Sequence, residues 1–322
     1  MTLDVFFYEA FEEEVAALRR VLPRGVKARF SSKTIQEQGD AVPPAALISI
    51  RTQSIVPPEW APQLRGVLSR STGYDHLAAY RARARPSLPC GYLPLYCHRA
   101  VAEQAMLLWM ALLRKLPHQI RSFARFHRDG LTGGECEHKV LLVVGVGHIG
   151  YEVARIGAGL GMKVLGVDLE RKHPSVHYVT IDEGLPRADI IVCAMNLTPA
   201  NTGYFRRARL RKAKKGALFV NVARGEHAPS ADLLRLLDEG RLGGVALDVY
   251  SQESVLAVQL RARRRARGEE LQAALALARH PQAILTPHNA FNTREAVERK
   301  AGHSIQQVLH FLRSGTFLWP VP

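Results

Sequence analysis

A glycine-rich turn in the middle of the chain constrains the fold more than any other feature. The apolar run Val140–Val144 leads directly into Gly145-Val146-Gly147-His148-Ile149-Gly150, and Tyr151–Leu160 has the pattern of a helix. A second apolar run, Lys163–Val167, follows and ends at Asp168. A G-x-G-x-x-G turn between a strand and a helix, with an acid about 20 residues further on, is typical of a dinucleotide-binding βαβ unit. The order of these segments therefore predicts a parallel sheet that binds a dinucleotide.

The residue types in the turn suit it to hold a pyrophosphate. Gly145 permits a tight turn, Gly147 lets the backbone approach the phosphates, and Gly150 allows the helix to pack closely on the strand. The N–H groups at the start of the helix, at His148 and Ile149, point toward the phosphates together with the positive end of the helix dipole. We therefore expect these residues to bind the cofactor.

Asp168 indicates which dinucleotide is bound. It lies 18 residues past Gly150, close to the spacing of the acid that binds an adenosine ribose. A carboxylate at this place hydrogen-bonds the 2′-hydroxyl and repels a 2′-phosphate, which favours NAD over NADP. Arg171 and Lys172, just beyond, could soften that preference.

Apolar runs alternate with helical patterns on both sides of the turn. Before it, the predicted strands are Leu3–Tyr8, Ala46–Ile50 and Gly66–Ser69. From the turn onward they are Val140–Val144, Lys163–Val167, Ile190–Met195, Ala217–Val222, Val245–Val249 and Ala283–Thr286. Continuous apolar runs are typical of parallel strands covered by helices on both faces. The pattern predicts an α/β protein.

A chain of 322 residues is long enough for two such domains. We expect residues 1–98 and 290–322 to form a substrate-binding (catalytic) domain, which includes a closing helix at about Thr293–Leu312. Residues 99–289 would form a NAD-binding Rossmann domain. The expected architecture is two Rossmann-like or flavodoxin-like, doubly wound parallel-sheet domains with the active site in the cleft between them. The predicted helix Ala100–Leu116 is apolar on nearly every face, so it must be buried in a core or against another subunit.

The charge of the chain is strongly positive. It has 44 Lys and Arg against 29 Asp and Glu, a net charge of +15. Such an excess can indicate nucleic-acid binding, but it also suits an anionic small-molecule ligand. Much of it lies in Arg206–Lys215 and Arg261–Arg267, which lack the interleaved aromatic residues of a base-stacking surface. We expect no nucleic-acid partner. Arg261–Arg267 is either a solvated surface or a device that steers anions, and we favour the former.

Other features of the sequence bear on cellular location, membrane binding and metal binding. The N-terminus lacks the basic and apolar regions of a secretory signal, and no uncharged apolar run reaches ~18 residues. We therefore expect a cytoplasmic protein with no membrane partner. The cysteines have no CxxC spacing and are expected to be free thiols, with no bound metal; they are Cys90, Cys97, Cys136 and Cys193.

Three ionisable residues follow predicted strands closely. Arg224 comes after Ala217–Val222, Glu253 after Val245–Val249, and His288 after Ala283–Thr286. Ligands of open α/β sheets bind at the edge where parallel strands end. An arginine, a glutamate and a histidine at that edge predict a site for an anionic substrate and a proton transfer.

The motifs around these residues resemble those of the D-isomer-specific 2-hydroxyacid dehydrogenase family. The resemblance covers about Ser69 to Gln307. It rests on the glycine turn and on Val101-Ala102-Glu103, Val222-Ala223-Arg224-Gly225, Leu247-Asp248-Val249 with Glu253, and Thr286-Pro287-His288. It implies an NAD(H)-dependent enzyme that interconverts a small 2-keto acid and the D-2-hydroxy acid, and, together with the apolar helix, a homodimer.

The resemblance also implies a role for each residue of the site. His288 would protonate the keto oxygen, Glu253 would hold the imidazole and favour its charged form, and Arg224 would bind the substrate carboxylate. Backbone N–H groups around Thr72 and Gly73 would complete the carboxylate site. The remaining positions would contact the cofactor; they are Thr198, Ala223 and Asp248, of which Asp248 would bind the nicotinamide carboxamide or support the site.

Two aromatic residues point to the D-lactate dehydrogenase-like branch. Tyr96 lies before Val101-Ala102-Glu103, and Phe291 follows His288. They favour pyruvate or a somewhat larger keto acid, although Phe291 could instead pack at a domain interface. The alternatives are glyoxylate, hydroxypyruvate or a phosphorylated hydroxy acid, for which Arg51 and Arg99 could supply extra positive charge. A protein of another class, an NADH-sensing corepressor that resembles the C-terminal binding proteins, would have the same fold.

Overall fold

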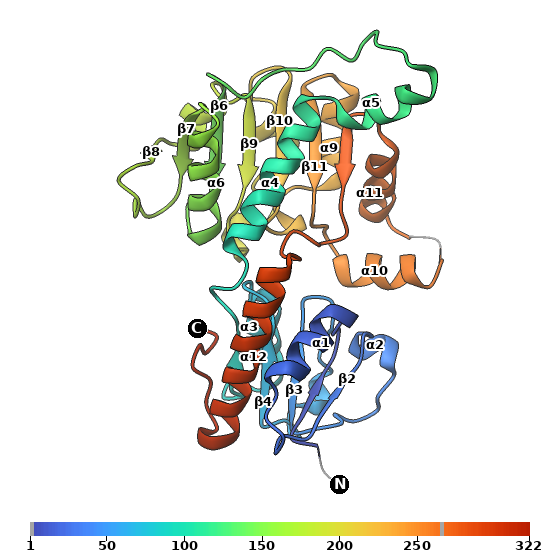
Figure 1. Ribbon diagram of the computed structural model, residues 1–322, viewed down its shortest axis with the longest axis vertical. Coiled ribbons are helices and arrows are strands. Elements are labelled where there is room, and N and C mark those ends of the chain that lie inside the picture. Colours follow the sequence, from blue (N-terminus) through green and yellow to red (C-terminus); the bar gives the residue numbers. More distant parts are fainter. Residues whose placement is uncertain (1–2, 265–266) are drawn as a thin grey trace. The chain divides into compact units, whose positions relative to one another are not determined.

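The computed structural model describes residues 3–264 and 267–322, which form two compact units. The first unit comprises the residues up to Cys97, Ser254–Arg263 and Asn292–Pro322, and the second comprises His98–Glu253 and the residues from Arg264 to Phe291. Each unit contains one parallel β-sheet with helices packed on it (Figure 1). The predicted fold class, two α/β units with doubly wound parallel sheets, is therefore confirmed.

The sheet of the first unit has the strand order β2-β1-β3-β4-β5. Its strands are β1 (Val5–Phe7), β2 (Ala28–Phe30), β3 (Leu47–Ile50), β4 (Gly66–Ser69) and β5 (Cys90–Gly91). This 2-1-3-4-5 order is the flavodoxin-like one. The helices are α1 (Glu12–Val21), α2 (Ile35–Gln38), α3 (Asp75–Ala84) and α12 (Arg294–Ser314), of which α1 and α12 pack against each other. Since every strand pair is parallel, the segments that follow β1, β3 and β4 emerge at one edge.

The sheet of the second unit has the order β12-β11-β10-β9-β6-β7-β8. Counted from β6, this is the 3-2-1-4-5-6 order of a dinucleotide-binding fold with one added strand. The strands are β6 (Val140–Val144), β7 (Lys163–Val167), β8 (His177–Tyr178), β9 (Ile190–Cys193), β10 (Ala217–Asn221), β11 (Leu242–Leu247) and β12 (Ala283–Leu285). The helices are α4 (His98–Leu113), α5 (Leu116–Ser122), α6 (His148–Gly159), α7 (Ile181–Gly184), α8 (Arg207–Leu210), α9 (Ser230–Asp238), α10 (Glu253–Arg261), which continues into the first unit, and α11 (Glu269–Arg279).

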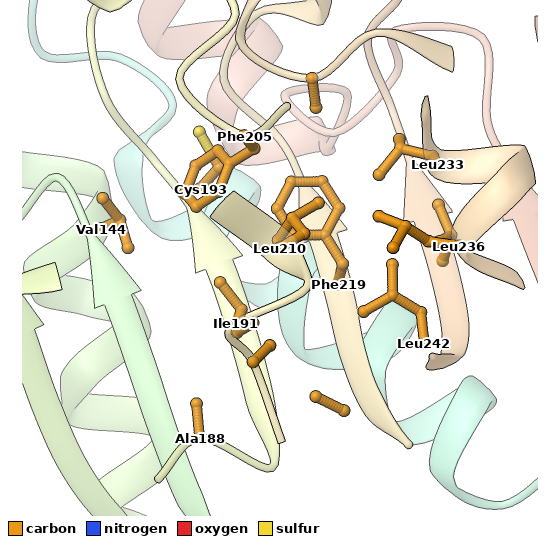
Figure 2. Packing of buried hydrophobic residues seen from close by; sticks show 14 of the residues in the cluster. Val144, Ala188, Ile191, Cys193, Phe205, Leu210, Phe219, Leu233, Leu236 and Leu242 are labelled. Carbon is orange, nitrogen blue, oxygen red and sulfur yellow. The ribbon is translucent and has the colours of Figure 1, made fainter. Parts of the chain in front are cut away.

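The core of the second unit shows why its strands are uniformly apolar. Phe205 and Phe219 are fully buried and contact each other edge to face, with ring centroids 5.0 Å apart. Leu233 and Leu236 of α9 and Leu242 of β11 close around them (Figure 2). Strands such as β9 and β10 are buried at every position, because helices cover both faces of the sheet.

The helix predicted at Ala100–Leu116 ends earlier than expected. In the structure α4 ends at Leu113, Lys115 adopts a left-handed conformation with φ +52°, and α5 begins at Leu116. Pro117 lacks the N–H that would bond to the carbonyl of Leu113, so the first helix cannot continue through it. α4 contacts α6, β10 and β11, but Leu107 on its outer side is 52% exposed. The unit thus buries only part of this apolar helix.

Three short strands also differ from the expectation. β2, β5 and β8 have two or three residues each, too few to produce a sequence pattern, and were not predicted.

In the arginine run, the Arg261 guanidinium donates to Glu37 Oε1 at 2.7 Å and to Gln53 at 2.9 Å, so its charge is paired. Arg265 lies outside the described residues. Of the helices in the described ranges, none is both long and apolar enough to cross a membrane.

Candidate active site

The glycine turn connects β6 to α6 in a backbone conformation that requires glycine. Gly145 has φ +90°, and a Cβ there would lie 2.6 Å from the backbone nitrogen of Met195. A Cβ on Gly150 would lie 1.8 Å from the carbonyl oxygen of Gly145. A Cβ on Gly147 would instead meet nothing within 4 Å, so the backbone is open there. A tight turn, an open backbone and a close helix contact are the three features that a pyrophosphate-binding turn needs.

Asp168 is tied to the glycine turn. Its Oδ2 accepts a hydrogen bond from the backbone N–H of Val146 at 2.5 Å, and its Oδ1 lies 3.3 Å from the backbone nitrogen of Glu170. Lys172 forms an ion pair with Glu170 at 2.7 Å. The acid at the end of β7 therefore stands beside the turn, while the charge of Lys172 is paired with another carboxylate.

The other candidate cofactor residues lie where β9 and β10 end. Thr198 is exposed and begins a short helical turn, in which its backbone nitrogen donates to Asn201 Oδ1 at 2.8 Å. Ala223 is buried, and its N–H donates to Asn221 Oδ1 at 3.0 Å. These segments follow β9 and β10, which are neighbours in the sheet; β9 also lies beside β6, and β10 beside β11.

The structure brings His288 and Glu253 together. Nδ1 of His288 lies 2.7 Å from Oε1 of Glu253, and the two side chains are only 17% and 15% exposed. Glu253 is the first residue of α10, whereas His288 follows β12 with φ +51°. A carboxylate on Nδ1 fixes the ring orientation and the tautomer, which leaves Nε2 as the atom that can exchange a proton with a ligand.

A buried carboxylate holds the loop that carries His288. Asp248 is 1% exposed and accepts hydrogen bonds from Thr286 Oγ1 at 2.5 Å and from the N–H groups of Asn289 and Ala290 at 2.9 and 2.8 Å. Burial raises the pKa of the Asp248 carboxyl, while the neighbouring His288 and these three hydrogen bonds act in the opposite direction. Asp248 therefore fixes the loop that carries His288.

Arg224 stands at the next strand end, on a rigid turn. Its Nη1 donates to the carbonyl oxygen of Ala223 at 2.9 Å, and its own carbonyl accepts from Asn221 Nδ2 at 2.8 Å. A Cβ on Gly225 would lie 1.9 Å from the carbonyl carbon of Tyr250, so the turn packs directly on the backbone after β11. Because β10, β11 and β12 are consecutive, the second unit places Arg224, Asp248 and His288 along one sheet edge.

The remaining candidates are Thr72, Gly73 and Tyr96 in the first unit and Phe291 in the second. Thr72 Oγ1 donates to the carbonyl of Leu93 at 3.2 Å, and the Gly73 carbonyl accepts from a neighbouring serine hydroxyl at 2.7 Å. Tyr96 and Phe291 are 3% and 5% exposed. The segment after β4 is thus held by side-chain hydrogen bonds.

Sequence reasoning missed several residues that shape the site. Asn221, the last residue of β10, is fully buried and fixes the Arg224 turn. The Tyr250 hydroxyl donates to the carbonyl of Thr286 at 2.7 Å. A polar residue at the end of an otherwise apolar strand was the available signal for Asn221.

Among the described residues, no group of three or more His, Cys, Asp or Glu could hold a metal ion, and all four cysteines are buried.

Comparison with known proteins identifies the family. The model of the D-isomer-specific 2-hydroxyacid dehydrogenase NAD-binding domain matches residues 106–290. A D-lactate dehydrogenase from Streptococcus pyogenes is 32% identical over 236 residues, which cover 70% of this chain and 69% of that protein. An aromatic 2-oxoacid reductase from Clostridium sporogenes is 30% identical over 230 residues, with 70% and 69% covered. The chain therefore belongs to the D-isomer-specific 2-hydroxyacid dehydrogenase family of NAD-binding oxidoreductases, as its motifs predicted.

Solved structures agree with this fold. A D-lactate dehydrogenase from Aquifex aeolicus, complexed with NAD and lactic acid, superposes with a TM-score of 0.84 at 24% identity and 98% coverage of both chains. The pyruvate reductase of Chlamydomonas reinhardtii gives a TM-score of 0.80 at 25% identity and 97% coverage of both chains. The likeness thus extends over nearly the whole chain, including the first unit.

We predict that Gly150→Ala weakens NADH binding by about tenfold or more, because its Cβ cannot fit 1.8 Å from the Gly145 carbonyl oxygen without opening the turn. Gly159→Ala is the matched control, since a Cβ at this position, at the end of the same helix, meets nothing within 4 Å. Fluorescence titration with NADH measures both. Equal affinities for the two variants would contradict this account of the turn.

Proposed function

We propose that the protein is an NAD(H)-dependent enzyme that reduces a small, pyruvate-like 2-keto acid to the D-2-hydroxy acid and catalyses the reverse oxidation. The observation that carries this proposal is the 2.7 Å contact between His288 Nδ1 and Glu253 Oε1 at the edge of a sheet with a dinucleotide-binding turn. A histidine oriented by a carboxylate is suited to general acid–base catalysis. The residues of the turn fit the cofactor, because the Gly145 and Gly150 positions admit no side chain and the Gly147 backbone is open.

Each residue has a defined role in the proposed reaction. Bound NADH supplies the hydride for the keto carbon. His288 Nε2 donates the proton that the keto oxygen takes up, and Glu253 stabilises the imidazolium form before that transfer. Arg224 binds the substrate carboxylate through its guanidinium. In the oxidation direction the neutral imidazole accepts the hydroxyl proton.

We propose a role for the remaining candidate residues of each unit. In this proposal Thr72 and Gly73 hold the substrate carboxylate through backbone N–H groups, and Tyr96 and Phe291 line the position of its side chain. His148, Ile149, Thr198, Ala223 and Asp248 complete the cofactor contacts, with Asp248 acting through the loop that carries His288. The first unit is then the substrate-binding domain and the second the NAD-binding domain.

We predict that His288→Ala lowers kcat by a factor of ~10²–10⁴, the usual effect of losing a general acid–base group. NADH affinity should change little, because the glycine turn is elsewhere in the unit. The assay is NADH oxidation with pyruvate, glyoxylate, hydroxypyruvate and a phosphorylated keto acid. Glu253→Gln keeps the shape of the partner but removes its charge and should also lower kcat. Near-normal turnover by His288→Ala would remove this residue from the mechanism.

We also propose that Asp168 makes NAD the preferred cofactor. Its position at the end of β7, bonded to Val146 of the turn, supports this assignment. Asp168→Ala should reduce the preference for NADH over NADPH by about tenfold or more, the loss expected for a charged hydrogen bond. The ratio of kcat/KM for the two cofactors measures it. Asp182→Ala on α7, which removes an exposed acid paired with Lys212, is the control. Equal use of both cofactors by the unaltered protein would refute the assignment.

We further propose that the protein is a homodimer, joined through α4, α5 and the turn after α5. Leu116, Ile120 and Phe123 follow helical spacing i, i+4 and i+7 and are 41%, 67% and 76% exposed. Leu107 of α4 and Phe126 beyond α5 are 52% and 74% exposed. Apolar side chains exposed in such a group are typical of an interaction surface.

The double variant Ile120→Glu, Phe123→Glu should therefore be a monomer of about 35.7 kDa by light scattering, where the unaltered protein has twice that mass. Charged side chains would be desolvated in the interface and oppose association. Leu169→Glu is the control, because Leu169 is fully exposed and lies far from the residues of this surface in the sequence. A monomeric unaltered protein at every concentration would contradict the proposal.

A further inference from the structure

One helix, α10, carries a residue of the candidate acid–base pair at its start and a strong polar contact at its end. Glu253, its first residue, belongs to the second unit, whereas Ser254–Arg263 belong to the first. Because the N–H and C=O groups of a helix bond to one another along its axis, its two ends move together. A contact made by Arg261, the last residue of α10, can therefore influence the position of Glu253.

The contact at the end of α10 is a bidentate ion pair with an added hydrogen bond. Arg261 Nε donates to Glu37 Oε1 at 2.7 Å, and its Nη2 donates to Glu37 Oε2 at 3.1 Å. Its Nη1 donates to Gln53 Oε1 at 2.9 Å. All three guanidinium nitrogens thus bond to α2 or to the segment after β3, which are parts of the first unit. A bidentate arginine–carboxylate pair fixes orientation as well as distance.

Glu37 is itself firmly held. Its Oε2 accepts from the backbone N–H and the hydroxyl of Thr34 at 3.0 and 2.8 Å, and this closes the capping box of α2. Partial burial acts to raise the pKa of Glu37, but the hydrogen bonds from Arg261 and Thr34 and the charge of Arg261 hold that pKa at about 2. The carboxylate is therefore charged throughout the pH range of an enzyme assay, and the ion pair does not titrate there.

The apolar packing of α10 is slight. Among its nine residues, all of them described, Leu256 alone is buried, and Val255 and Leu260 are 41% and 48% exposed. Just before the helix, Gln252 has φ +56°, a left-handed conformation that costs energy for a residue with a side chain. Most helices in proteins are stabilised by packing of an apolar face. Since α10 has little of it, the Arg261 contacts are a large part of what fixes this helix.

At the start of α10, one contact depends on the position of the helix. Glu253 Oε1 lies 2.7 Å from His288 Nδ1, and such a bond weakens steeply as its distance and angle depart from the optimum. The backbone beside His288 is fixed separately, because Asn289 and Ala290 donate to Asp248. A displacement of α10 would therefore move the carboxylate away from the imidazole and leave the imidazole in place.

We propose that Arg261 is a positioning residue for the acid–base pair of Glu253 and His288. Its contacts with Glu37 and Gln53 fix the end of α10, and the helix transmits that constraint to Glu253. Arg261 acts through the helix and not by contact with the substrate. This inference rests on the proposed function, because it needs His288 to transfer the proton. It gives the first member of the arginine run a role other than a solvated surface or a device that steers anions.

The test measures how kcat depends on pH in Arg261→Gln, with the full-length protein, NADH and the keto acid of the earlier panel that is reduced fastest. Reduction needs the charged imidazole, which a nearby carboxylate favours. A less closely held Glu253 should therefore move the alkaline fall of kcat to lower pH by about one unit, which makes kcat there about tenfold lower. At lower pH, where the imidazole is charged in both proteins, the two kcat values should converge. NADH affinity, measured by fluorescence titration, should not change.

A second variant removes the same ion pair from the other side. Glu37→Gln loses the negative charge, but glutamine can still close the capping box of α2. It should shift the pH profile as Arg261→Gln does, and the double variant should be no worse than either single one, because both remove one interaction. In a His288→Ala background, Arg261→Gln should not lower kcat further, since its effect passes through that imidazole.

Two controls separate positioning from general effects of charge and stability. Arg20→Gln removes an exposed ion pair with Glu298 that joins α1 to α12 in the same unit. Arg263→Gln removes an exposed charge of the same arginine run, just beyond α10. Both variants should keep the pH profile of the unaltered protein. Thermal unfolding of every variant shows whether a lower Tm occurs without a change in the profile, as a merely structural role predicts.

The outcomes separate this inference from the proposed function. An alkaline fall of kcat that moves to lower pH in Arg261→Gln and Glu37→Gln, and in neither control, supports the positioning role. Profiles that coincide with that of the unaltered protein, with or without a lower Tm, overturn it and leave the dehydrogenase function standing. A further loss of kcat in the His288→Ala background also overturns it. No reduction of any keto acid of the panel by the unaltered protein overturns both.

Discussion

The hydrogen bonds accepted by the buried carboxylate of Asp248 fix the geometry on which the candidate chemistry depends. The residue follows β11, and its partners lie on the segment after the neighbouring strand, β12. It therefore joins two strand ends and holds the left-handed backbone of His288 between its contacts at Thr286 and Asn289. An imidazole that transfers a proton depends more on a fixed position than on a strong interaction with an adjacent group. Glu253 can then orient the ring through a single contact.

The sequence was sufficient for the features that a local pattern determines. Each strand that is buried on both faces gave an apolar run, and β6 and β7 have the predicted bounds. The glycine turn could be located because each of its glycines meets a separate steric demand. Arg224, Glu253 and His288 could be placed at one edge because parallel strands all end on the same side. The roles of these residues came from the family resemblance, and they remain proposals.

Other features depend on contacts between distant segments, which no local pattern records. Arg70 and Lys300 both pair with Glu14, although they lie 56 and 286 positions away from it in the sequence, on elements with unrelated patterns. Tyr250 was missed for the same reason, since its hydroxyl donates to the carbonyl of Thr286 on another segment. The side chain of Asn221 bonds to the nearby Ala223 and Arg224, and it was missed although a polar residue at the end of an apolar strand was a local signal. The end of α4 was misplaced because Pro117 interrupts the backbone bonding inside an apolar stretch that continues without change in composition.

Glu14 and Asp248, two of the buried carboxylates, show how one chemical group has different functions in the two units. Arg70 and Lys300 lower the pKa of Glu14 to about 2 against the effect of burial, so it is an anion at neutral pH. Asp248 accepts mainly from neutral donors, and burial raises its pKa. A charged Glu14 pairs with two cations and joins α1 to the segment after β4 and to α12, whereas Asp248 fixes the loop that carries His288. The first unit thus uses ion pairs, and the second uses hydrogen bonds from neutral donors, to fix the segments that follow their strands.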